Sequence, residues 1–136
     1  MRVYYEDTDA GGVVYHSNYL TFMERARTEW LRALGFEQNN IRDEWQVLIV
    51  IHSMQIAFKK PAKFNDLLII QSHLTALGSS SWHCTQRILR DNEVLIEAQV
   101  KAAFVNSHNF KPTRIPAAIL QAAKPLILKN TVLESP

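Results

Sequence analysis

The sequence contains one long amphipathic segment, and the segments that follow it have the pattern of β-strands. Over residues 18–34, apolar side chains recur every three or four positions, which places them on one face of an α-helix. These apolar residues are Tyr19, Phe22, Met23, Ala26, Trp30, Leu31 and Leu34. Ser17 or Asn18 suits the start of this helix as a side-chain cap, and Gly35 suits its end. The helix therefore needs one partner layer to cover its apolar face.

Most of the remaining chain predicts β-strands separated by short turns. We expect strands over residues 2–6, 47–58, 67–77, 81–90 and 93–105, and a short helix over 116–124 with a proline in its first turn. The last strand alternates apolar and polar side chains, and short turns join the last three strands into an antiparallel meander. A sheet of about five strands is roughly as wide as the helix is long, ~25 Å. The predicted fold class is therefore α+β, with one helix lying across one sheet.

The length and composition fit one cytoplasmic domain. A chain of 136 residues with 47% apolar residues can bury one ordinary core, so we expect a single domain with a loose tail over residues 126–136. The single cysteine, Cys84, cannot form an internal disulfide, which favours the reducing cytosol, and its mid-strand position favours a packed, unreactive thiol. No stretch approaches the ~20 apolar residues that cross a membrane. The net charge of +2 is too balanced to predict a nucleic-acid partner.

The segment before the helix, residues 7–17, carries the most unusual side chains. Glu6, Asp7 and Asp9 place three carboxylates within four residues, and two glycines and His16 follow. Thioester hydrolysis needs a carboxylate that attacks or activates water, together with donors that stabilise an oxyanion, and the first amides of a helix are such donors. Asp and Gly are also ordinary turn residues. Asp7, Asp9 and His16 would also suit a metal ion, although no second cluster of ligands supports one.

Residues 2–16, with residues 18–19 and 24–27 behind them, form a long and specific motif. This motif closely resembles the 4-hydroxybenzoyl-CoA thioesterase family, and most nearly its branch of acyl-CoA thioesterases associated with the Tol-Pal system. Residues 111–112 and 115–116 resemble the closing segment of that branch. The resemblance covers most of the chain and implies the hot-dog fold, in which a curved antiparallel sheet wraps around the long helix.

The resemblance also implies roles for particular residues. Asp9 would be the catalytic carboxylate, Tyr5 and His16 its active-site companions, and the amides at the helix start would polarise the thioester carbonyl. An aromatic residue usually stands at the position of His16 in the aryl-CoA branch, so His16 favours an aliphatic acyl-CoA substrate. Family members form dimers by pairing sheet edges, often as dimers of dimers, with active sites at subunit interfaces. We expect no cofactor and no metal.

Further substrate-binding candidates lie in two places. Tyr15, Ser17 and Asn18 flank the start of the predicted helix, where they would lie beside a substrate held at its amides. Lys60 and Lys63 would suit the phosphates of CoA, although a solvated basic surface is the favoured explanation for these lysines.

The expected function is hydrolysis of acyl-CoA to a carboxylic acid and CoA, with Asp9 as nucleophile or general base. The sequence leaves the choice between these two roles open. A second hypothesis is a non-catalytic module that binds acyl-CoA or an acyl carrier protein in a lipid-synthesis or envelope assembly. A hot-dog dehydratase would need its own pattern of His, Asp and Asn on the helix, and this pattern is absent.

Overall fold

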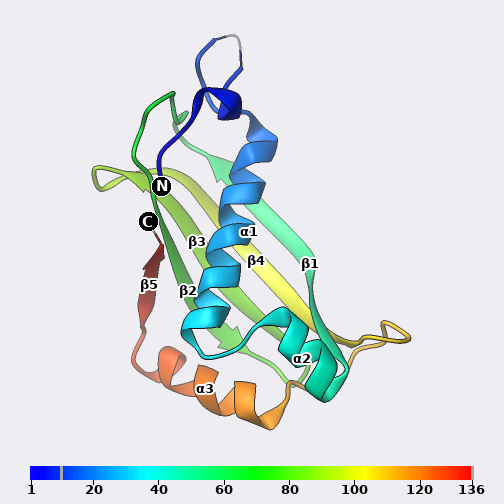
Figure 1. Ribbon diagram of the computed structural model, residues 1–136. Coiled ribbons are helices and arrows are strands. Elements are labelled where there is room, and N and C mark those ends of the chain that lie inside the picture. The colour runs from blue at the N-terminus through cyan, green and yellow to red at the C-terminus, as the bar shows by residue number, and fades with distance from the viewer. Residues whose placement is uncertain (10, 136) are drawn as a thin grey trace.

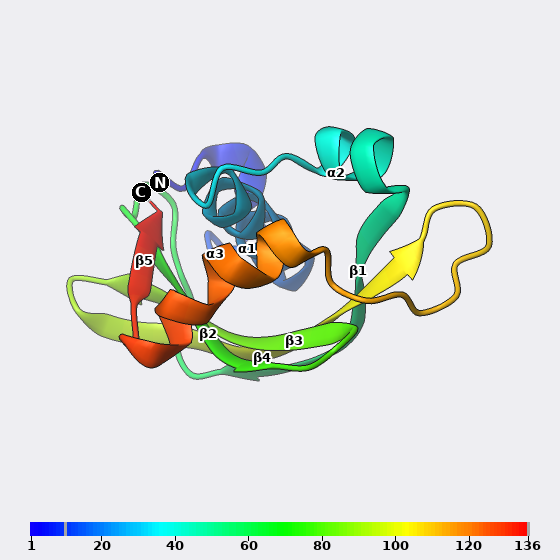
Figure 2. The same cartoon turned by 90° about the horizontal axis from the view of Figure 1, so that it is seen from below.

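One long helix, α1 (His16–Ala33), lies in the hollow of a curved antiparallel sheet (Figure 1). The structure, a computed structural model, describes residues 1–9 and 11–135, so Ala10 in the predicted loop and Pro136 in the predicted tail lie outside the described residues. Figure 2 shows the sheet curving beneath α1, with its two edge strands rising on either side. The predicted α+β class and hot-dog fold are confirmed. None of the described helices is long and apolar enough to cross a membrane.

Helix α1 has nearly the bounds that the apolar spacing predicts for residues 18–34. Its buried residues are Tyr19, Phe22, Met23, Ala26, Trp30 and Leu31. Gly35 ends the helix as predicted, with φ at +98°, a left-handed conformation that glycine adopts without steric cost. The predicted side-chain cap at Ser17 or Asn18 is wrong, because Tyr15 is the N-cap residue and no side chain caps the helix.

Four strands have bounds within two residues of those predicted. They are β1 (Val47–Phe58), β2 (Ile69–Leu77), β3 (Ser81–Arg90) and β4 (Glu93–Asn106). β2, β3 and β4 form the predicted antiparallel meander, and β1 pairs with β4 at one edge of the sheet. The face of β4 beneath α1 is apolar and buried at Ile96, Ala98, Val100, Ala102 and Phe104. The core therefore lies between this face and the apolar stripe of α1.

The predicted first strand over residues 2–6 is wrong. Residues Tyr5–Asp7 form a 3-10 turn, η1, and Arg2 takes part only in an isolated bridge with Leu67. Local hydrogen bonds close this turn, since the Thr8 amide and hydroxyl both donate to the carbonyl of Tyr5. Such bonds compete with the ladder of a sheet.

The fifth strand comes from the other end of the chain, so the predicted loose tail is also wrong. α3 (Ala117–Leu128) runs beyond the predicted 116–124, and Pro116 is its N-cap rather than a residue of its first turn. β5 (Val132–Ser135) then pairs antiparallel with β2. The backbone groups at the edge of β2 are satisfied by this pairing, which explains why the tail is ordered.

One described helix has no counterpart in the sequence prediction. α2 (Gln38–Trp45) is short, buries only Ile41, and ends at Gln46 in a left-handed conformation with φ at +57°. α2 packs against β1, whereas α1 packs more closely against β2 and β5. This offset leaves a space that is lined by the middle of α1 and by Ile49 and Ile51 of β1.

Candidate active site

The described residues of the pre-helix loop, residues 8–9 and 11–15, fold back on themselves before the chain enters α1. Thr8 and Val14 form an antiparallel bridge, and the Asp9 amide donates to the carbonyl of Val13 over 2.9 Å. The Gly12 amide donates to the carbonyl of Asp9 over 3.0 Å, at a φ of +80° that favours glycine. These backbone bonds hold Asp9 in a defined turn, paired with Val13, which lies three residues before α1 begins at His16.

The carboxylate of Asp9 is half-buried and held by loop amides. Its Oδ1 accepts hydrogen bonds from the amides of Gly11 at 2.8 Å and Val13 at 3.4 Å. Its Oδ2 has no hydrogen-bond partner among the described residues. One oxygen is thus fixed, and the other is available to a ligand.

Asp7 joins the turn η1 to the helix, and both oxygens of its carboxylate accept hydrogen bonds. Its Oδ1 accepts from the side-chain amide of Asn18 at 2.9 Å, and its Oδ2 accepts from the Tyr4 amide at 3.0 Å. Its carbonyl accepts from the Tyr15 amide. Asp7 therefore shapes the loop, and Asn18, predicted to bind substrate, has its side chain occupied by this contact.

The first turn of α1 offers free amides next to this loop. The Asn18 amide donates to the carbonyl of Tyr15, but the amides of His16 and Ser17 have no partner among residues 1–9 and 11–135. Such amides, with the helix dipole behind them, form a ready site for a negatively charged oxygen.

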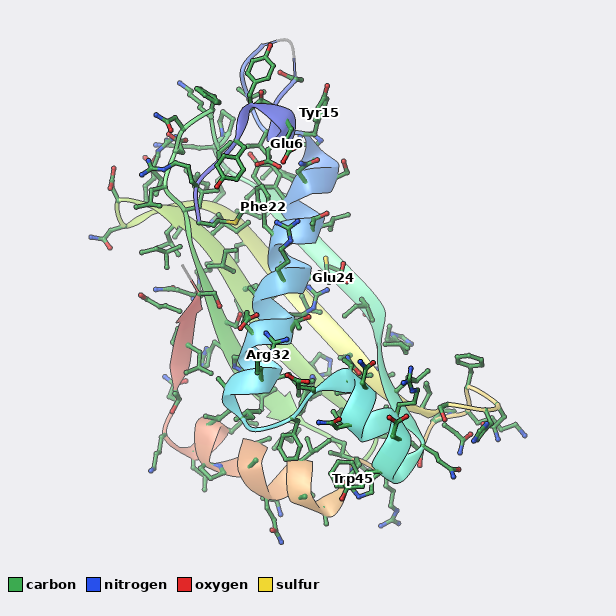
Figure 3. All side chains as sticks on the ribbon, viewed as in Figure 1. Glu6, Tyr15, Phe22, Glu24, Arg32 and Trp45 are labelled. Carbon is green, nitrogen blue, oxygen red and sulfur yellow. The ribbon has the colours of Figure 1, made fainter. Side chains whose placement is uncertain are left out.

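His16 and Tyr5 lie at the same end of the molecule as Asp9, but on its surface. The His16 imidazole stacks on the ring of Phe58 at 4.5 Å, and the Tyr5 ring meets Phe64 edge-on at 6.0 Å. Neither side chain forms a hydrogen bond with Asp9 within the described residues. Figure 3 shows Tyr15 at this end, where its side chain and that of Ser17 are exposed. The roles of these side chains stay predictions.

The two predicted phosphate-binding lysines lie in different surroundings. Lys60 forms an ion pair with Glu93 at 2.6 Å, and Glu93 also receives a hydrogen bond from Arg90. Lys63 has an exposed side chain, and its backbone pairs with Val13 of the pre-helix loop. Lys63 is thus better placed than Lys60 to meet a ligand at this loop.

A cavity of about 310 Å³ lies beside α1, toward β1, and the sequence did not predict it. Its apolar walls come from Trp30, Leu31, Ile49, Ile51, Trp82 and Ala102. Glu24, near the middle of α1 in Figure 3, and Arg27 are the charged residues that line it. This volume is at the lower end of the range for small-molecule sites. The apolar walls come from segments far apart in the chain, so no local pattern could have revealed the cavity.

Cys84 also lines this cavity, and its surroundings make it unreactive. Burial raises the pKa of the Cys84 thiol to about 11, while the nearby Arg27 opposes the shift. At neutral pH the side chain is therefore a neutral thiol and not a nucleophile. Among the described residues, no group of three or more His, Cys, Asp or Glu side chains is arranged to hold a metal ion.

The curved antiparallel sheet around one long helix, together with the relatives described below, defines this protein as a thioesterase of the hot-dog class. Comparison with known proteins agrees, since the family model of the Thioesterase-like superfamily matches residues 3–123 of this sequence. The chain belongs to this superfamily.

Individual relatives span nearly the whole chain. The acyl-CoA thioesterase YbgC of Haemophilus influenzae is 42% identical over 122 residues, which cover 90% of this chain and 90% of the relative. The acyl-CoA thioester hydrolase YbgC of Escherichia coli O157:H7 is 43% identical over 125 residues, covering 91% and 92%. A solved structure, described as a probable thioesterase from Bartonella henselae, matches with a TM-score of 0.81 at 38% identity and covers 85% of this chain and 95% of that chain.

Proposed function

We propose that this thioesterase hydrolyses aliphatic acyl-CoA thioesters to a carboxylic acid and CoA, with Asp9 as the catalytic carboxylate. The observation that carries the proposal is that loop amides hold Oδ1 of Asp9 and leave Oδ2 without a partner among the described residues, in the loop that leads into the free amides of His16 and Ser17. The relatives from Haemophilus influenzae and Escherichia coli, which are named for acyl-CoA thioester hydrolysis, support the same reaction.

The geometry supports a mechanism in which the carbonyl oxygen of the thioester rests at the helix start. The amides of His16 and Ser17 donate to this oxygen and stabilise the negative charge that develops on it. Asp9 then attacks the carbonyl carbon, the CoA thiolate leaves, and water hydrolyses the resulting anhydride. Alternatively, Asp9 takes a proton from a water that attacks the carbon, and this proton passes to the leaving thiolate.

The cavity supports an aliphatic acyl group as the part of the substrate that enters the protein. Its walls are mostly apolar, and it lies along the flank of the helix whose start would bind the carbonyl. The inner face of β1 between His16 and the cavity is also apolar: Met54 and Ile56 pack against the core, and Phe58 stacks on His16. Lys63, exposed beside the pre-helix loop, would meet a phosphate of CoA.

The free edge of β1 supports a homo-oligomer, either a dimer or a dimer of dimers. β1 is an edge strand of twelve residues, and Val50 and Ile51 on it are exposed. A long edge of this kind invites pairing with a second copy. Light scattering coupled to gel filtration tests this point, and a monomer at micromolar concentration would contradict it.

The substitution Asp9→Asn tests the assignment of the catalytic carboxylate. Asparagine keeps an oxygen for the Gly11 amide but can neither attack the carbonyl nor accept the proton, so turnover should fall by ~10²–10⁴ while the fold is retained. Thiol release is measured with aliphatic and aromatic acyl-CoAs and with an acyl carrier protein thioester. The control is Asp91→Asn in the turn between β3 and β4, where a left-handed backbone suits asparagine. Unchanged turnover in Asp9→Asn would refute the assignment.

Single-turnover hydrolysis in ¹⁸O-labelled water separates the two roles of Asp9. In the nucleophilic route, water can cleave the anhydride at the aspartyl carbon, which leaves label in the enzyme. In the general-base route, label enters only the product acid. Mass spectrometry of the peptide that contains Asp9 reads the difference.

A further inference from the structure

Tyr19 is a buried polar residue that the proposed mechanism does not use. Its side chain is 2% exposed, and its ring packs against Phe22 at 6.3 Å and Phe58 at 5.9 Å. Its hydroxyl accepts a hydrogen bond of 2.8 Å from the backbone amide of Ala62, which is fully buried. The two residues are far apart in the chain, so this bond ties α1 to the connection between β1 and β2.

The connection that Tyr19 anchors is itself bonded to the pre-helix loop. The Ala62 carbonyl accepts from the Val14 amide at 2.9 Å, and Val13 and Lys63 form an antiparallel bridge. The Phe64 amide donates to the carbonyl of Gly12 at 3.2 Å. One side of the loop is thus fixed along its length by the segment that begins at Ala62.

The other side of the loop carries Asp9. The carbonyl of Val13 accepts from the Asp9 amide, and the amide of Val13 reaches Oδ1 of Asp9. Three hydrogen bonds, joined by the backbone of Ala62 and by the peptide bond between Val13 and Val14, therefore connect the hydroxyl of Tyr19 to the carboxylate of Asp9. Tyr19 lies only three residues after His16 on the same helix. These bonds therefore tie the position of Asp9 to the first turn of α1, which carries the free amides.

We infer that Tyr19 is a positioning residue, whose hydroxyl sets the place of Asp9 relative to the helix-start amides by holding Ala62. The inference rests on the proposed role of Asp9 as the catalytic carboxylate. Without the hydroxyl, the Ala62 amide is left buried and unpaired, and the loop that it holds can shift. A displacement of about 1 Å between a carboxylate and a carbonyl carbon is enough to lower the rate by ~10²-fold.

Tyr19 acts through position and not through proton transfer. Burial raises the pKa of its phenol above the usual value, although the Ala62 hydrogen bond opposes this shift. The group therefore stays protonated across the working range of pH. A variant that lacks the hydroxyl should keep the shape of the pH–rate profile and lose only its height.

The substitution Tyr19→Phe tests the inference, because it removes one oxygen and keeps the packed ring. We expect kcat to fall by about 10- to 100-fold with little change in KM, when measured well below the melting temperature. Thr85→Val is the matched control, since it removes a buried hydroxyl that donates to Gln99 in the sheet. Its kcat should stay within about 2-fold of the wild type.

A double-mutant cycle distinguishes positioning of Asp9 from an independent effect. If Tyr19 acts through Asp9, adding Tyr19→Phe to Asp9→Asn should cost less than about 2-fold in residual turnover. If Tyr19→Phe lowers turnover by the same factor in the wild type and in Asp9→Asn, the inference is overturned. A Tyr19→Phe enzyme with wild-type kcat would also overturn it.

Amide hydrogen exchange provides a readout that does not depend on the role of Asp9. In Tyr19→Phe the amides of Asp9 and Val14 should exchange faster, while those in β3 keep their protection. If Asp9→Asn stays active, the proposed catalytic role fails, and the exchange data alone still decide whether Tyr19 holds the loop. Unchanged exchange at both amides would overturn the positioning role.

Discussion

The amide nitrogen of Gly11 lies 2.8 Å from Oδ1 of Asp9, and a Cβ atom at Gly11 would lie 3.2 Å from the same oxygen. The loop therefore wraps so closely around the carboxylate that only glycine leaves it undisturbed. This separation is tighter than an ordinary van der Waals contact, so a larger residue at position 11 must move either the loop or the carboxylate.

Gly11→Ala should lower kcat by about 10-fold, because the carboxylate has to shift by a few tenths of an ångström from the added methyl group. The control is Gly35→Ala at the other end of α1, where φ is +98° and no atom lies within 4 Å of the added Cβ. That variant should lose about 1 kcal/mol of stability and keep its kcat. Steady-state thiol release and thermal unfolding check both variants, and equal kcat values for Gly11→Ala and the wild type would contradict the expectation.

Gln86→Leu should lower the free energy of unfolding by about 2–4 kcal/mol. Gln86 is fully buried, donates to the Met23 carbonyl and the Ser72 hydroxyl, and accepts from Arg27 at 3.0 Å. Leucine leaves the half-buried guanidinium of Arg27 without this acceptor. Urea unfolding measures the change.

The control for Gln86 is Gln71→Leu, which removes a hydrogen bond of 3.0 Å to Glu134 on the exposed side of β2. We expect a loss within about 1 kcal/mol, because water replaces an exposed hydrogen bond. If Gln86→Leu and Gln71→Leu lower the free energy of unfolding by similar amounts, the burial of Gln86 contributes no additional stability.

The stability of the protein should fall between pH 9 and pH 11 through Cys84. Burial raises the pKa of this thiol to about 11 from an ordinary value of 9.0. The folded state therefore holds the proton more tightly than the unfolded chain, and the associated stability is complete below pH 9 and lost as the pH rises through the folded pKa. The free energy of unfolding should lose about 2–3 kcal/mol through this thiol between pH 9 and pH 11.

Cys84→Ala isolates this contribution from other groups that titrate in alkali. Urea unfolding at a series of pH values should give a shallower decline for the variant than for the wild type. Parallel declines in the two proteins would rule out the thiol as the cause.

A chain that ends at Thr131 should be less stable by about 2–4 kcal/mol, because it lacks the ladder between β5 and β2. The open edge of β2 should also promote association, which light scattering detects. Leu133→Pro tests the same pairing without shortening the chain, since proline cannot donate to the ladder. If neither variant changes urea unfolding, the pairing of β5 contributes no stability.

Local patterns in the sequence predicted α1, four of the five strands and the candidate catalytic loop. Helix and strand periodicities are properties of neighbouring residues, so the spacing from Tyr19 to Leu34 and the alternation in residues 93–105 indicated which faces would be buried. The motif around Asp9 likewise marked the candidate site through its resemblance to known thioesterases. The roles of Asp9, His16 and Tyr5 in catalysis stay predictions.

Tertiary structure alone decided the features that depend on partners far away in the chain. β5 has little strand signal of its own and is ordered because β2 presents an unpaired edge. The hydrogen bond between Tyr19 and Ala62 and the cavity beside α1 have no signature in any short segment. Periodicity determines which face of an element is apolar, but which residues meet across the core follows only from the packing of those faces.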